Sequence, residues 1–68
     1  MMSIVYNGTA QEVEEAIPLH LHLTNEGLAD QSGIAVAVNE TVIPKKDWPN
    51  QILQPQDKIL VIKATQGG

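Results

Sequence analysis

The clearest strand in the sequence reads Ile34-Ala35-Val36-Ala37-Val38, in which large aliphatic residues alternate with alanine. Successive side chains of a strand point to opposite faces of the sheet, so the three large residues share one face and the two alanines share the other. We expect the large residues in the core. Asn39-Glu40 then predicts a tight turn into a short strand at residues 41–43, which ends at Pro44.

An N-terminal hairpin is predicted upstream of this strand. Asn7-Gly8 is the favoured pair for a two-residue hairpin turn, because both positions need a positive φ. Residues 3–6 form the first strand of this hairpin, and residues 10–14 form the returning strand.

The segment between the hairpin and residue 34 gives conflicting signals. In Leu19-His20-Leu21-His22-Leu23 the leucines recur at every second position, which is a strand pattern. A helix remains an alternative, because Leu19 and Leu23 would share one helical face. Pro18 suits the first turn of such a helix, and Gly27 is a typical stop signal. Periodicity alone favours the strand.

The C-terminal part of the chain contains one more strand. Pro44 precedes residues 45–50, and Pro49 lies within them. For these residues we expect an irregular segment or a single helical turn. Gln54-Pro55-Gln56-Asp57 predicts a turn. Residues 58–63 form the last strand, and residues 64–68, with nothing to pack against, are expected to form a mobile tail.

With a helix in the segment that follows Pro18, these elements predict an α+β domain over residues 1–63. The helix would pack on one face of a mixed sheet. A chain of 68 residues forms one domain and buries only about 60% of the surface that its unfolded form exposes. A deep, enclosed active site is hard to build from so little material. The length therefore favours a carrier, a modifier or a binding module over an enzyme.

The composition excludes several classes of function. Eight acidic residues against four lysines give a net charge of −4, whereas phosphate binding needs clustered basic residues, so no nucleic-acid partner is expected. The absence of cysteine excludes disulfides and thiol chemistry on a side chain. No apolar run approaches the length of a membrane span, and the N-terminus has no signal-peptide pattern, so we expect a cytoplasmic protein with no membrane partner.

Side chains with catalytic or metal-binding chemistry form no convincing set. His20 and His22 lie two residues apart, but a metal site needs three or four converging ligands, so we interpret them as exposed or half-buried histidines. Glu12, Glu14 and Glu15 are interpreted as a solvated strand face. We predict no catalytic residue and no metal site within the chain.

The carboxyl terminus is the candidate reactive group. Gly67-Gly68 presents a backbone without side chains, which can follow paths that any side chain would block. A terminal carboxylate is a poor electrophile, but conversion to an acyl-adenylate with ATP supplies a good leaving group. A sulfur nucleophile then gives a terminal thiocarboxylate. No phosphate-binding loop is present in the sequence, so a partner must supply the ATP site.

Four segments of the sequence form a pattern found in a known family. They are Gly33-Ile34-Ala35-Val36-Ala37-Val38-Asn39, Val42-Ile43-Pro44-Lys45-Lys46-Asp47-Trp48, Asp57-Lys58-Ile59 and Gln66-Gly67-Gly68. In these segments the chain resembles the ThiS family, the sulfur-carrier proteins of thiamine biosynthesis. The resemblance covers about the whole chain. It implies a β-grasp, ubiquitin-like fold with a sheet of four to five strands, and a helix over residues 18–27 in place of the strand that periodicity favours. Gln56 departs from the family, whose members often carry glycine before the aspartate of this turn.

The same resemblance implies the partners. A ThiF-like enzyme would adenylate Gly68 with ATP, a persulfide donor would supply the sulfur, and a ThiG-like thiazole synthase would receive it. Gln66 and Gly67 would be recognised as part of the tail. No cofactor would be bound tightly by the chain itself.

Alternation along the last strand predicts a docking surface. If Ile59 and Val61 face the core, then Leu60 and Ile62 face outward beside the tail. Exposed aliphatic side chains there suggest a partner surface. Ala35 and Ala37 would be its flat neighbours.

Three other functions remain open. They are a MoaD-like small subunit of molybdopterin synthase, a ubiquitin-like modifier joined to lysines through Gly68, and a plain interaction module. The Pro44-to-Trp48 segment favours the thiamine carrier.

Overall fold

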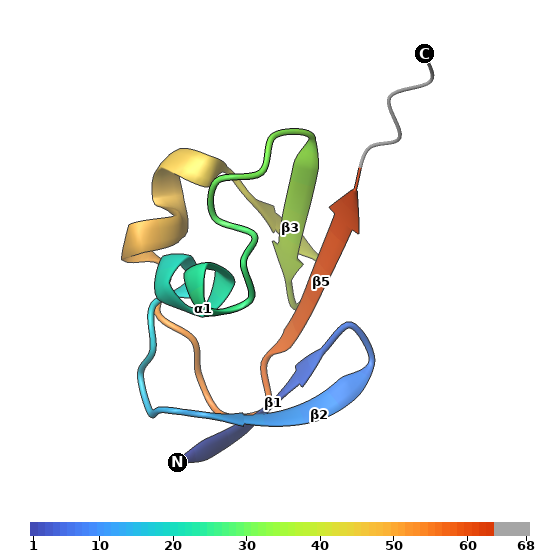
Figure 1. Cartoon of the computed structure of the whole chain (residues 1–68). Helices are drawn as coiled ribbons and strands as arrows, with labels where there is room; N and C mark the ends of the chain where they lie inside the picture. Colours follow the sequence, from blue (N-terminus) through green and yellow to red (C-terminus); the bar gives the residue numbers. More distant parts are fainter. Residues whose placement is uncertain (64–68) are drawn as a thin grey trace.

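A five-stranded mixed sheet organises the computed structural model, which describes residues 1–63 (Figure 1). The strands are β1 (Met2–Tyr6), β2 (Thr9–Val13), β3 (Ile34–Val38), β4 (Thr41–Ile43) and β5 (Lys58–Lys63). Their order is β2-β1-β5-β3-β4, and only the central pair, β1 and β5, is parallel. The predicted mixed sheet and N-terminal hairpin are confirmed, with β2 beginning one residue earlier than expected.

Both hairpins turn on residue pairs with positive φ. Asn7 and Gly8 have φ of 50° and 84°, and Asn39 and Glu40 have φ of 51° and 71°. A two-residue turn with two positive φ angles matches the twist of the strands that it joins. Each turn asparagine also accepts a backbone N–H of β5 through its Oδ1, Asn7 from Val61 at 2.8 Å and Asn39 from Lys58 at 3.0 Å. The turns therefore hold the central strand in place.

Residues 19–23, where the leucine spacing favours a strand, lie in a helix, α1 (Leu19–Asn25). The strand prediction is therefore wrong, and the helix implied by the resemblance is confirmed. Its buried residues, Leu19, His22 and Leu23, recur at intervals of three and four and lie against the sheet. Leu21, which caused the two-residue spacing, is 44% exposed. Gly27 follows with φ of 77°, a conformation that glycine adopts without strain.

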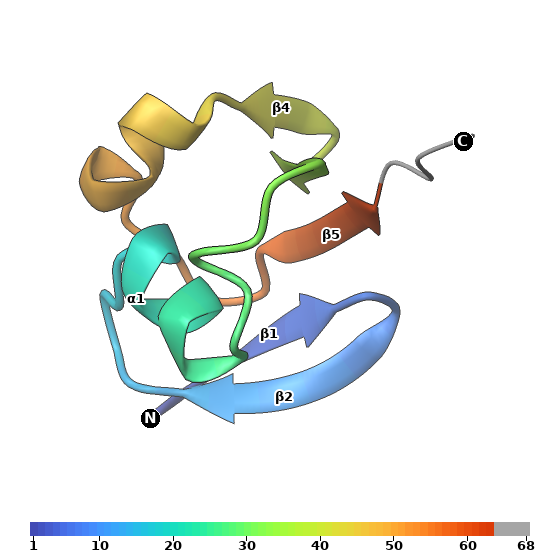
Figure 2. The same ribbon diagram turned by 45° about the horizontal axis from the view of Figure 1, so that its top comes forward.

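A short 3₁₀ helix, η1 (Lys45–Asn50), follows β4. Of the two alternatives expected there, an irregular segment or a single helical turn, the helical one is nearer, although six residues make about two 3₁₀ turns. Its Trp48 is only 2% exposed and donates its indole N–H to the carbonyl oxygen of Ile43 at 2.9 Å. A buried indole needs such a partner, because an unpaired N–H in the core is costly. Both helices lie on the same side of the sheet (Figure 2).

The core fills the space between the helices and the inner face of the sheet. Of the large residues of β3, Val36 and Val38 are buried as expected, and Ile34 is half-buried. The remaining core side chains are aliphatic apart from Trp48: Met2, Ile4, Val13, Ile17, Leu19, Leu23, Leu28, Leu53 and Ile59. The helices described within residues 1–63 are too short and too polar to cross a lipid bilayer.

Candidate functional site

The predicted reactive terminus, with Gln66, Gly67 and Gly68, lies outside the described residues. The structure does describe the strand that precedes it. β5 lies in the centre of the sheet, between β1 and β3, and ends at Lys63, five residues before Gly68. The surface around β5 is therefore the part of the molecule nearest in sequence to the terminus.

Two large aliphatic side chains, Leu60 and Ile62, project from the outer face of β5. Leu60 is 50% exposed and Ile62 is 51% exposed, whereas Ile59 is 2% exposed. The alternation predicted from the sequence is thus confirmed. Apolar side chains left half in water beside a strand are typical of a surface that a partner covers.

The neighbouring alanines of β3 differ from one another. Ala35 lies opposite Ile62 and Ala37 lies opposite Leu60, so all four side chains share the outer face. Ala35 is exposed, as expected, but Ala37 is 9% exposed and therefore buried, so it is not an open, flat neighbour. It contributes to the floor of a hollow.

This hollow has a volume of about 240 Å³. It is lined by Val5, Gly8, Ala37, Glu40, Lys58, Ile59 and Leu60. Its walls are almost wholly apolar, and its two charged residues, Glu40 and Lys58, have opposite signs. A volume below the roughly 300–1,000 Å³ of small-molecule sites suits a single inserted side chain better than a metabolite.

Sequence analysis missed one residue of this face. Val42 of β4 lies opposite Ala37 and is 64% exposed, so it extends the apolar surface across the sheet. The signal was present in the sequence, because the two-residue turn at Asn39-Glu40 sets this register. We call the group of Leu60, Ile62, Ala35 and Val42 the outer-face patch.

A buried aspartate holds the turn that leads into β5. Asp57 is 8% exposed, and its carboxylate accepts hydrogen bonds from the Asn39 side-chain amide at 2.9 Å and from the Gln54 backbone N–H at 2.8 Å. Gln56, before it, has φ of 68°, which favours glycine. A glycine would adopt this conformation without strain, so Gln56, noted above as a departure from the family resemblance, adopts it at some cost.

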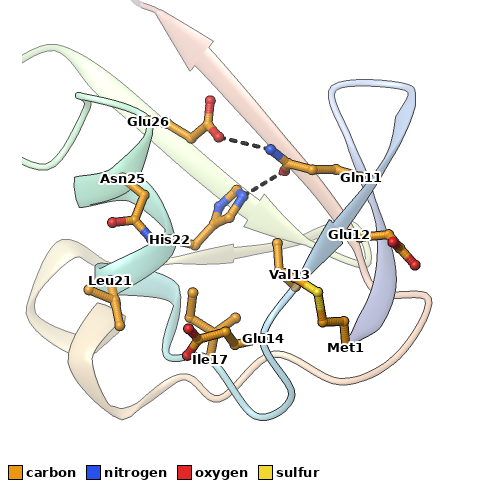
Figure 3. A pocket seen from close by; sticks show the side chains of 10 residues that line it. All are labelled: Met1, Gln11, Glu12, Val13, Glu14, Ile17, Leu21, His22, Asn25 and Glu26. Carbon is orange, nitrogen blue, oxygen red and sulfur yellow. Dashed lines mark hydrogen bonds between the residues drawn. The ribbon is translucent and has the colours of Figure 1, made fainter.

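On the helix side of the sheet, His22 is buried rather than exposed or half-buried as predicted, with 2% of its surface accessible. Gln11 donates its amide to Glu26 at 2.9 Å, which leaves its carbonyl oxygen to accept from His22 Nε2 at 2.9 Å (Figure 3). The Tyr6 ring meets the imidazole edge-on at 5.0 Å. Burial lowers the pKa of His22 from its ordinary 6.5, and the negative charge of Glu26 opposes this only in part.

The remaining candidates from the sequence are dispersed on the surface. His20 is exposed and points away from His22, as expected for residues two apart on a helix. Glu12, Glu14 and Glu15 are exposed, and Glu15 lies 3.7 Å from the N-terminal amino group. Within residues 1–63, no three histidine or carboxylate side chains are arranged to hold a metal ion.

The architecture is that of a β-grasp, ubiquitin-like domain: a mixed five-stranded sheet whose central pair is parallel, with one main helix packed on one face. A domain of this class presents its last strand at the centre of the sheet. The sequence model of the ThiS family matches residues 4–68, and the chain belongs to that family.

Individual relatives agree with this assignment. The sulfur carrier protein ThiS of Escherichia coli (strain K12) is 30% identical over 67 residues, which span 98% of this chain and all of that protein. The crystal structure of a thiamine biosynthesis protein (ThiS) from Geobacter metallireducens superposes with a TM-score of 0.85 at 19% identity and covers 98% of this chain and all of that one. The solution NMR structure of a thiamine biosynthesis protein from the same organism superposes with a TM-score of 0.76 at 19% identity. It covers 98% of this chain and 88% of that one. These two structures support the fold.

Proposed function

We propose that this chain is a sulfur carrier of thiamine biosynthesis whose Gly68 carboxyl group is the site of modification. One observation carries the proposal: the family match extends to residue 68, so the terminal Gly67-Gly68 belongs to the shared sequence. The E. coli relative bears the name of a sulfur carrier, and its whole length is covered by the alignment.

The chemistry proposed for Gly68 has three steps. The carboxylate attacks the α-phosphorus of ATP on a ThiF-like enzyme, which releases pyrophosphate and leaves an acyl-adenylate. A persulfide sulfur then attacks the acyl carbon, AMP leaves, and a thiol cleaves the sulfur–sulfur bond to yield the thiocarboxylate. Because the chain contains no cysteine, the terminus is where it would carry this sulfur. The sulfur passes to a ThiG-like thiazole synthase.

The outer-face patch is the proposed docking surface for the activating enzyme. Its apolar side chains are exposed, and β5 connects them directly to the tail. Binding there would bury Leu60 and Ile62 and present the terminus to an ATP site on the partner. The hollow at Ala37 would accept one apolar side chain of that enzyme, in the manner of a hot-spot pocket. The proposal places the chain in the cytoplasm, where ATP is available to the activating enzyme.

The test measures the intact mass after incubation with a ThiF-like enzyme, ATP and a persulfide donor. Exchange of one oxygen for sulfur adds about 16 Da, since activation exposes the acyl carbon to attack. A chain lacking Gly68 is the control and should gain nothing. If the full chain gains no mass with an enzyme that is active on its own carrier, the proposal fails. Transfer of the sulfur to a thiazole synthase, and not to a large pterin-synthase subunit, distinguishes the thiamine carrier from a MoaD-like one.

A further inference from the structure

A second surface lies on the helix side of the sheet, where α1 faces the edge strand β2. The groove between them has a volume of about 420 Å³ (Figure 3). Val13 and Ile17 are buried in its floor, and Leu21 of α1 is exposed along it. Glu12, Glu14 and Glu26 also line it, and all three are exposed. The groove thus has an apolar floor, and carboxylates border it.

The backbone edge of β2 borders this groove and is unpaired within residues 1–63. The two-residue turn makes Tyr6 and Thr9 a hydrogen-bonded pair, so every second residue of β2 directs its N–H and C=O toward β1. The residues between them, Ala10 and Glu12, direct theirs outward. An extended segment can therefore pair with β2 along this edge, as in β-strand addition.

The floor of the groove is held rigid before any ligand arrives. Gln11 projects from β2 and is fixed at both ends of its amide, by Glu26 and by the buried His22 of α1. These bonds tie the strand to the helix across the groove. A preformed groove lowers the entropy cost of binding, because fewer side chains must be ordered when the ligand binds.

The charges beside the groove and the edge of β2 select the ligand. Glu14 and Glu26 line the groove, and Glu12, which alternates with the buried Val13, belongs to the outer face of β2; in the described part of the chain the lining contains no lysine. Met1, which is among the described lining residues, carries a positive amino group, and this group lies 3.7 Å from Glu15. A segment with acidic residues would meet like charges here, whereas lysine or arginine side chains would meet opposite ones.

We propose that the groove between β2 and α1 binds an extended segment of a partner protein in which aliphatic residues alternate with lysine or arginine. The segment adds to the edge of β2 through Ala10 and Glu12. Every second side chain, aliphatic, enters the groove above Val13 and Ile17, and the intervening basic side chains meet Glu12 on the opposite face. Because this site uses neither Gly68 nor the outer-face patch, a second partner can be held while the terminus is processed.

The probe for this proposal is a hexapeptide of alternating lysine and valine, with the matching glutamate–valine peptide as its control. Titration into the ¹⁵N-labelled chain should shift the amide signals of β2 and α1 and slow the amide exchange of Ala10 and Glu12. We expect the lysine peptide to bind at least about tenfold more tightly than the glutamate peptide, because like charges in contact are strongly unfavourable. Salt should weaken its binding.

Two variants test the geometry. Ala10→Pro removes an outward N–H without breaking the ladder to β1 and should weaken binding, as Glu12→Lys should by reversing a charge. Asp30→Lys makes the same charge change on an exposed residue outside the groove and should leave the affinity nearly unchanged. The amide spectrum of each free variant shows whether it is folded. If Glu12→Lys is not, Glu12→Gln removes the same negative charge; if Ala10→Pro is not, the slowed amide exchange of Ala10 and Glu12 in the native chain tests the pairing, and unchanged exchange with bound peptide contradicts it. Equal affinity for the two peptides, shifts confined to the outer-face patch, or full affinity of folded Ala10→Pro would overturn the proposal.

Discussion

Replacing Leu60 by aspartate tests the outer-face patch, because this side chain is half exposed in the free chain and would be buried under the activating enzyme. The substitution has a moderate cost to the fold: the half of the leucine that is already buried contributes about half of 1.5–3 kcal/mol, and the poor strand propensity of aspartate adds up to about 1 kcal/mol. The sum is smaller than the roughly 5–15 kcal/mol of a typical domain. We therefore expect a folded variant with an unchanged pattern of amide signals outside β5 and its neighbours.

The expected loss in activation follows from the exposed fraction. Full burial of a leucine side chain contributes about 1.5–3 kcal/mol, so burying the exposed 50% of Leu60 contributes about half of that. Leu60→Ala should accordingly weaken the complex about three- to tenfold. Aspartate adds the cost of a charge facing an apolar surface, so Leu60→Asp should lose about 2–4 kcal/mol in all, a factor of about 30 to 1,000.

The assay is ATP–pyrophosphate exchange by a ThiF-like enzyme, measured against the concentration of the carrier. The loss should appear as a higher KM for the carrier, because Leu60 would contribute to binding and not to the chemistry at Gly68. Leu21→Asp is the matched control, since Leu21 is 44% exposed but projects from α1 on the other side of the sheet. Full activity of folded Leu60→Asp, or an equal loss in Leu21→Asp, would refute the docking surface.

Three further predictions follow from the terminus, the buried histidine and the turn before β5. One alanine added after Gly68 should abolish activation, measured as loss of pyrophosphate exchange; normal turnover of the extended chain would contradict the carrier function. The lowered pKa of His22 means that the fold favours its neutral form, so its contribution to stability is complete above pH 6.5 and is lost as the pH falls from there through the folded-state pKa. Urea unfolding at pH 7.5 and 5.5 should show this loss in the native chain and a smaller one in His22→Gln, and equal losses would refute it. Gln56→Gly should raise the free energy of unfolding by up to about 1 kcal/mol, because glycine adopts φ of 68° without strain. The gain is limited because glycine also has more conformational entropy in the unfolded chain. If urea unfolding shows that the variant is destabilised, Gln56 is not strained.

Much of the sheet was predictable because its signals are local. The alternation at residues 34–38 and 58–63 and the Asn-Gly turn each depend on neighbours within a few residues, and all three were confirmed. The helix was not predictable from periodicity, since the leucines at 19, 21 and 23 favour a strand. A helix of seven residues has little stability of its own, so the burial of Leu19 and Leu23 against the sheet determines its conformation.

The candidate sites also include features that the sequence indicates and features that depend on packing. The outward direction of Leu60 and Ile62 could be inferred from the chain alone, because alternation sets the faces of a strand. The proposal for Gly68 also comes from the sequence, since Gly67-Gly68 lies outside the described residues. The burial of Ala37 could not, because it depends on how closely β3, β4 and β5 pack around it.

Tertiary structure also decided the contacts that join distant parts of the sequence. Asn7 binds Val61 across 54 residues, and His22 meets Gln11 across 11. Nothing in the local sequence indicates which partners these polar side chains bind. They are specified only when strands and helix pack together, since a buried N–H or imidazole must then find a partner that water no longer provides. The sequence by itself thus determined the strands, both hairpin turns and the position of the terminal Gly67-Gly68, and the packed fold determined the helix, the buried histidine and the groove.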